Sequence, residues 1–156
     1  MKFVLAHLST AKEDWCDKAT DLYIKKLKHF VEFEVVALKP RKGSRSDESH
    51  KRQEEAETIL AFLKEGDELV IFDERGKIQS SEKFADMVRS VHESGKKRVV
   101  FLIGGAFGLD DQVKKRARLQ VSLAPFVMNH LVAKVVALEQ IYRSFTILKG
   151  LPYHNK

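Results

Sequence analysis

The sequence contains a single cysteine, Cys16, so no disulfide can form within the chain. It has no apolar run of 18 residues, and Lys12 and Glu13 follow too soon after the first apolar residues for a secretory signal. The six histidines are scattered without HxxxH or CxxC spacing, so we expect no metal site. These shortages predict a protein of the reducing cytoplasm that does not enter the membrane.

What is present is typical of a globular protein. A chain of 156 residues with 44% hydrophobic and 32% charged side chains can bury a core, and we expect one domain over residues 1–156. Its net charge of +6 favours a polyanionic partner. Basic residues concentrate in one glycine- and serine-containing segment, which is either a phosphate-backbone contact or a solvated loop, and its candidates are Lys39, Arg41, Lys42 and Arg45.

Apolar patterning along the chain alternates between strand and helix periodicity. We expect strands at 2–8, 31–38, 68–73, 98–103 and 119–123, and helices at about 10–30, 47–64, 80–94, 110–117 and 131–149. Thr10 and Glu13 are spaced as a capping box for the first helix. Regular alternation predicts the α/β class, with a mostly parallel sheet flanked by helices.

A glycine-rich segment directly follows the fourth expected strand. Gly104, Gly105 and Gly108 precede Asp110, which has the character of a helix N-cap. Glycines at the end of a buried strand let a backbone approach a ligand closely, but the same residues also suit a tight turn. The spacing is neither the dinucleotide fingerprint nor a P-loop, and both interpretations stay open.

Three segments follow the carboxyl ends of expected strands, at 72–77, 104–108 and 123–130. In a parallel sheet such ends share one edge, so the three segments could border one pocket. The third segment is unusually apolar for a loop. It either packs into the core or lines the pocket.

The last expected helix carries an apolar stripe wider than one sheet face needs. A homodimer interface would cover the second side, and a central position within a monomer is the alternative. On this helix Glu139 and Arg143 have i,i+4 spacing, which predicts a structural ion pair. The terminal Tyr153 and His154 are either frayed or offer a stacking surface and a titratable group.

Four segments together resemble one known family. They are Leu102-Ile103-Gly104-Gly105-x-x-Gly108-Leu109, the 122–130 loop, Glu139-Gln140-Ile141-Tyr142-Arg143 and the closing Tyr153-His154. In order and spacing they resemble the RlmH-type SPOUT-class methyltransferases, which methylate N3 of a pseudouridine in large-subunit ribosomal RNA. The resemblance extends over essentially the whole chain.

The resemblance implies a C-terminal trefoil knot, against the general rule that chains are unknotted, and a homodimer formed through the knotted region. It implies S-adenosylmethionine as cofactor and the assembled ribosome or its subunit as substrate. Carried over by position, the cofactor contacts are Phe72, Gly104, Leu123, Ala124, Pro125, Phe126, Val127 and Met128. Arg143, Tyr153 and His154 would lie near the target base, with the tail completing the partner subunit's site.

In this interpretation His154 is the candidate base for the N3 proton and Arg143 the stabiliser of the developing anion. The chain departs from the family at Phe72, Asn129 and Lys134, where an aliphatic residue, proline and arginine are usual. Two alternatives remain: a SPOUT methyltransferase acting on tRNA, and a non-catalytic RNA-binding or ribosome-associated factor.

Overall fold

The computed structural model describes residues 1–8, 12–40 and 47–155. Within these ranges the chain forms five strands: β1 (Lys2–Leu8), β2 (Glu32–Leu38), β3 (Glu68–Ile78), β4 (Arg98–Ile103) and β5 (Leu119–Ser122). The helices are α1 (Asp14–Leu27), α2 (Glu48–Phe62), α3 (Ser81–His92), α4 (Asp111–Arg116) and α5 (His130–Leu148). All strand pairs are parallel, in the order β2-β1-β4-β3-β5. The predicted α/β class is confirmed, and the trefoil knot stays a prediction.

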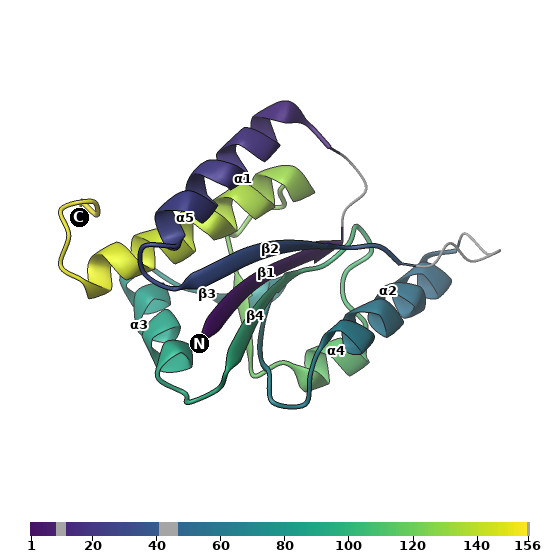
Figure 1. Cartoon of the computed structure of the whole chain (residues 1–156). Helices are drawn as coiled ribbons and strands as arrows, with labels where there is room; N and C mark the ends of the chain where they lie inside the picture. Colours follow the sequence, from purple (N-terminus) through teal and green to yellow (C-terminus); the bar gives the residue numbers. More distant parts are fainter. Residues whose placement is uncertain (9–11, 41–46, 156) are drawn as a thin grey trace.

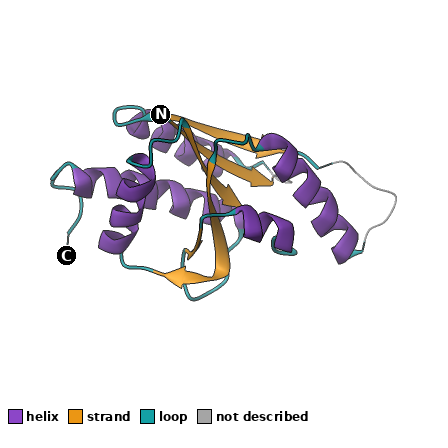
Figure 2. Ribbon diagram, turned by 90° about the horizontal axis from the view of Figure 1, so that it is seen from below, coloured by secondary structure: helices purple, strands orange, loops and turns teal. Residues whose placement is uncertain are grey.

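Helices cover both faces of the sheet, with α1, α3 and α5 on one side and α2 and α4 on the other (Figure 1). Figure 2 shows the same layering from below. The alternation within β1 explains it: Phe3 and Leu5 pack in the core beneath α1, α3 and α5, whereas Val4 and Ala6 pack with α2 and α4. A parallel sheet buried on both faces needs such continuous apolar strands.

Local signals predicted several helix starts. Ser80 caps α3 by accepting from the Lys83 N–H at 3.2 Å, and Asp110 caps α4 by accepting from the Gln112 N–H at 2.9 Å. The expected capping box of α1 is wrong, because it places Glu13 in the first turn of the helix. Glu13 occupies the N-cap position itself and makes no side-chain cap hydrogen bond. Thr10 lies outside the described residues.

The expected end of the third strand at residue 73 is wrong, because β3 continues to Ile78. β3 pairs with β5 as far as Phe72, leaves the ladder, and resumes pairing where Lys77 lies opposite Val121. Gly76 permits the return, since a Cβ there would lie 2.7 Å from both the backbone N and C of Val121. We call residues 73–76 the β3 excursion.

Part of the apolar stripe of α5 is covered within the chain. α1 and α3 both pack against α5, and Ala137, Leu138 and Ile141 are fully buried in the shared core. At the start of the helix Val135 and Val136 are half-buried and Val132 is 40% exposed, so the homodimer stays a prediction. No helix in the described ranges is long and apolar enough to cross a bilayer.

Candidate functional site

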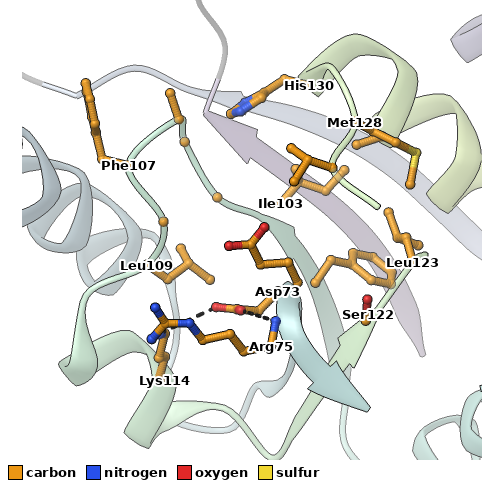
Figure 3. A pocket seen from close by; sticks show the side chains of 18 of the residues that line it. Asp73, Arg75, Ile103, Phe107, Leu109, Lys114, Ser122, Leu123, Met128 and His130 are labelled. Carbon is orange, nitrogen blue, oxygen red and sulfur yellow. Dashed lines mark hydrogen bonds and ion pairs between the residues drawn. The ribbon is translucent and has the colours of Figure 1, made fainter. Parts of the chain in front are cut away.

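A cavity of about 670 Å³ opens at the carboxyl edge of the sheet (Figure 3). Strand register places it there, since Phe72 pairs with both Ile103 and Val121 and thereby aligns the ends of β3, β4 and β5. All three segments singled out from the sequence contribute to its lining. The structure thus brings them together around one cavity.

One wall of the cavity is apolar and the other is charged. Phe72, Ile103, Leu123 and Met128 supply apolar surface from the three strand ends and the third segment. Among the predicted cofactor contacts, those that line the cavity are Phe72, Gly104, Leu123, Ala124, Phe126, Val127 and Met128. Pro125 is exposed and does not line it.

The charged wall is built on the β3 excursion. Asp73 accepts from the Arg75 N–H at 2.8 Å and pairs with the Lys114 ammonium at 3.6 Å (Figure 3). Its side chain is only 9% exposed, so the pair is partly shielded from water. Together these contacts fix the acidic group at the rim of the cavity.

Carboxylates outnumber cations around this cavity. The acidic lining residues are Glu48, Asp73, Glu74, Asp110 and Asp111, and the basic ones are Arg52, Arg75 and Lys114. The local excess of negative charge contrasts with the net charge of +6 of the whole chain. Such a cavity favours a cationic ligand over a nucleoside phosphate.

The glycines after β4 are required by their neighbours as well as by the cavity. A Cβ on Gly104 would lie 2.7 Å from the Cδ2 of Leu109, and one on Gly105 would lie 2.5 Å from the carboxylate of Glu55. Gly108 has φ +79°, a conformation that glycine adopts freely. The segment is thus a tight turn and also a cavity wall.

The apolar third segment lines the cavity and is not tucked into the core. Phe126 and Val127 are 69% and 80% exposed and contribute to the lining. Ser122 anchors the start of the segment by donating to the Ala124 carbonyl at 2.7 Å. Asn129 caps α5 by accepting from the Leu131 N–H at 2.8 Å.

The predicted catalytic residues form a second cluster at the other end of α5. Arg143 pairs with Glu139 at 2.6 Å, which confirms the predicted ion pair, and donates to the Nδ1 of His154 at 3.1 Å. Tyr153 lies under the Arg143 guanidinium, 4.8 Å from ring centroid to Cζ, and donates to Glu139 at 3.2 Å. The tail is therefore held against α5.

Two effects set the charge states in this cluster. Burial and the Glu139 carboxylate raise the pKa of Tyr153 to about 12, so its hydroxyl stays a donor at neutral pH. Because a guanidinium only donates, Nδ1 of His154 accepts, and the Nε2 of a neutral ring donates to Glu82 at 3.0 Å. The contacts thus select one tautomer.

The tail cluster and the cavity are far apart within one chain. Ala133 lines the cavity and Arg143 belongs to the cluster, ten positions further along α5. At 1.5 Å per residue this is about 15 Å. The structure therefore does not bring the predicted cofactor contacts and the predicted catalytic residues together within one chain.

The basic candidates are only partly described. Lys39 is exposed directly after β2, whereas Arg41, Lys42 and Arg45 lie outside the described residues. Sequence reasoning missed Glu48 and Arg52 of α2, which line the cavity. They lie about 50 residues before the glycines, and no local pattern signals the contact.

The comparisons with known proteins agree with this architecture. The family described as "Predicted SPOUT methyltransferase" matches residues 1–154. The chain belongs to the SPOUT methyltransferase family. The matched region includes the residues of the cavity, of α2 and of the tail cluster.

Individual SPOUT relatives match over nearly full length. A protein of Bdellovibrio bacteriovorus named "Ribosomal RNA large subunit methyltransferase H" is 50% identical over 99% of both chains. Proteins with the same name from Christiangramia forsetii and Alkaliphilus oremlandii are 36% and 33% identical, over 86% and 99% of this chain and 87% and 100% of theirs. The resemblance found in the sequence motifs is confirmed.

Proposed function

We propose that this single-domain chain is a cytoplasmic, S-adenosylmethionine-dependent methyltransferase of large-subunit ribosomal RNA. Its target is N3 of a pseudouridine in the assembled ribosome or subunit. The observation that carries the proposal is the acid-rich, apolar-walled cavity built by three strand-end segments of a SPOUT chain. The names of the full-length relatives support the RNA substrate.

The lining suits this cofactor in charge and in shape. S-adenosylmethionine has a net positive charge through its sulfonium, and five lining carboxylates face three basic side chains. Phe72, Ile103 and Leu123 supply apolar surface for a flat base, and the glycine segment supplies backbone groups without side-chain obstruction. When bound, the cofactor supplies an electrophilic methyl group.

Arg143 and His154, at the other end of α5, would help to deprotonate the nucleophile. N3 of a pseudouridine carries a proton, which must leave as the methyl group arrives. Arg143 stabilises the anionic base, and His154 accepts the proton. Because the Nδ1 of His154 accepts from Arg143, a base role requires the ring to leave that contact.

A homodimer resolves the separation of the two halves of the site. With about 15 Å between the cavity and the Arg143 cluster along α5, a tail from a second chain is needed to place both beside one base. Trp15 and Leu22 of α1 and Val132 of α5 are 47%, 51% and 40% exposed and offer apolar surface for that contact. The exposed Lys39 and its basic neighbours in sequence would contact the RNA backbone.

The test combines cofactor binding and methyl transfer. Calorimetry should detect S-adenosylmethionine binding, and labelled methyl groups should enter ribosomes lacking this modification, with mass spectrometry locating them on a pseudouridine. Naked ribosomal RNA and bulk tRNA are the comparison substrates. Cofactor binding with methylation of tRNA alone would favour the tRNA enzyme, and ribosome binding without cofactor binding would favour the non-catalytic factor.

A further inference from the structure

Helix α2 contacts the glycine loop, residues 104–108, at three points. Arg52 donates to the Phe107 carbonyl at 3.4 Å, and the Lys51 ammonium lies 5.4 Å from the centroid of the Phe107 ring. The Glu55 carboxylate lies against Gly105, where a Cβ would be 2.5 and 2.6 Å from its two oxygens. Gly105 lines the cavity and Glu55 does not, so Glu55 meets the loop from outside the cavity.

The Glu55 carboxylate is incompletely satisfied in this position. Its Oε2 is buried and has no hydrogen-bond partner among the described residues. Burial raises the pKa of Glu55, and the nearby Lys51 ammonium opposes this effect. A buried acceptor without a donor opposes folding, so the carboxylate adds nothing to the core that an apolar side chain would not supply better.

The glycine loop depends on outside contacts for its shape. The backbone–backbone hydrogen bond described inside it runs from the Gly108 N–H to the Gly105 carbonyl at 3.2 Å. Gly105 and Gly108 have no side chains to restrict them, and glycine has the widest range of backbone conformations. The contacts that limit this range are Leu109 beneath Gly104, and Arg52 and Glu55 of α2.

We propose that Glu55 is a positioning residue for the cofactor loop. Its carboxylate occupies the space beside Gly105 and, with Arg52 on the Phe107 carbonyl, holds the loop backbone in the conformation that receives S-adenosylmethionine. Glu55 acts through the loop and does not touch the cofactor. The cofactor part of this inference rests on the proposed function, whereas the ordering of the loop does not.

The first experiment measures the two effects separately. Hydrogen exchange of the ligand-free protein should show faster exchange at 104–108 in Glu55→Ala, with β1 and β4 unchanged. Calorimetry should show the Kd for S-adenosylmethionine rising about tenfold, because a loop without this contact must be ordered when the cofactor binds. Glu55→Gln, which keeps the length and one carbonyl oxygen, should stay within about threefold of the parent.

Glu57→Ala is the matched control. Glu57 is exposed on the same helix two residues on, and removing it changes the charge of α2 by the same amount. It should alter neither loop exchange nor cofactor affinity. An equal effect of both alanine variants would assign the result to the charge of α2 and overturn the role of Glu55.

A double-mutant cycle with Gly105→Ala tests the contact itself. The added methyl group must push the Glu55 carboxylate aside, so Gly105→Ala should weaken cofactor binding as Glu55→Ala does. The double variant should then be no worse than the weaker-binding single variant. Additive losses would mean that the two residues act independently and would overturn the proposal.

The possible failures are distinguishable. If the parent protein binds no S-adenosylmethionine, the proposed function fails, and loop exchange still decides whether Glu55 orders the loop. If the parent binds and Glu55→Ala binds equally well with unchanged loop exchange, the positioning role is wrong. If Glu55→Ala does not fold, Glu55→Gln and Gly105→Ala decide by the same two measurements.

Discussion

His7, near the carboxyl end of β1, lies close to the buried Lys134 of α5. Burial, and secondly the Lys134 ammonium, lower the pKa of His7 from 6.5 to about 4. The folded protein therefore keeps this ring neutral where the unfolded chain protonates it. The buried, neutral ring of His7 contributes fully to stability above pH 6.5, and this contribution is lost as the pH falls from 6.5 towards 4.

We expect His7→Gln to flatten the pH dependence of stability in that window. In denaturant titrations, the free energy of unfolding of the parent should fall by about 2 kcal/mol more between pH 7 and pH 4.5 than that of the variant. The full pKa shift would give a larger difference, but the ring keeps some contact with solvent. The raised pKa of Glu55 acts in the opposite direction but cancels in this comparison. Parallel pH profiles for the two proteins would contradict the assignment.

Tyr153 lies in the C-terminal tail, for which the sequence left open whether it is frayed or ordered. It packs edge-on against Tyr142 with ring centroids 4.9 Å apart, lies under Arg143, and donates to Glu139. We expect Tyr153→Ala to lower the free energy of unfolding by about 1–2 kcal/mol, the sum of an aromatic pair and a hydrogen bond.

Tyr153→Phe is the control for this prediction, since it keeps the ring and loses the hydroxyl. Chemical denaturation should give it a loss of about 0.5–1 kcal/mol, the scale of one hydrogen bond. Equal stability of the alanine variant and the parent would mean that the tail contributes nothing to folding and that its packing against α5 is incidental.

Residue-level prediction succeeded where the cause is local. The caps at Ser80 and Asp110 depend on hydrogen bonds two or three residues away, and their residue types signal them. The contact between Glu55 and Gly105 joins residues 50 positions apart, and nothing near either one signals it. For Gly104 the sequence left open whether a ligand or a tight turn requires the glycine, and it could not show that the Leu109 side chain does.

Among the elements, β3 combines a structural role with a role in the site. Its pairing with β5 is interrupted so that Asp73, Glu74 and Arg75 reach the cavity, and it resumes at Lys77. The sequence predicted the apolar strand as far as residue 73. It could not show that the chain rejoins the same ladder, since that depends on the backbone of β5 beside Gly76.

We expect Gly76→Ala to disturb this element. The new methyl group would meet the Val121 backbone, which cannot move as a flexible side chain can, so the variant should lose about 1–3 kcal/mol of stability by overpacking. Cofactor affinity should fall as well, because the excursion carries the Asp73–Lys114 pair to the cavity. Thermal denaturation and calorimetry measure the two effects.

Gly66→Ala provides the matched control, since a Cβ there meets nothing within 4 Å and the residue has no positive φ. It should leave stability unchanged or slightly raise it by restricting the unfolded chain. If both variants behave alike, the close approach of β3 and β5 at Gly76 does not restrict that position.

At the scale of the whole molecule, the alternation of strands and helices was sufficient to predict the fold class and the cavity at one sheet edge. The same pattern left open what covers the wide stripe of α5, and α1 and α3 of the same chain cover part of it while Val132 stays exposed. Which helices flank α5 follows from the order of strands in the sheet, and periodicity along the chain does not contain that order.

The division of the site predicts complementation between chains. In a homodimer where each tail completes the partner's cavity, Ala124→Trp would fill the cavity of its own chain, and Arg143→Ala would remove the cluster that its chain supplies. Each variant alone should be inactive on ribosomes. A purified mixed dimer should regain about half of the parent activity, because one of its two symmetry-related sites combines an intact cavity with an intact tail.

Light scattering should first give about twice the chain mass of 17.9 kDa for the parent and for the mixed dimer, which shows that the two variants assemble. Two differently tagged copies of the Ala124→Trp chain serve as the control and should regain no activity. If the mixed dimer assembles but stays inactive while each variant folds, the cavity and the tail do not complete each other across chains. The tail of each chain would then have to cross about 15 Å to its own cavity, which requires it to leave Arg143 and Glu82.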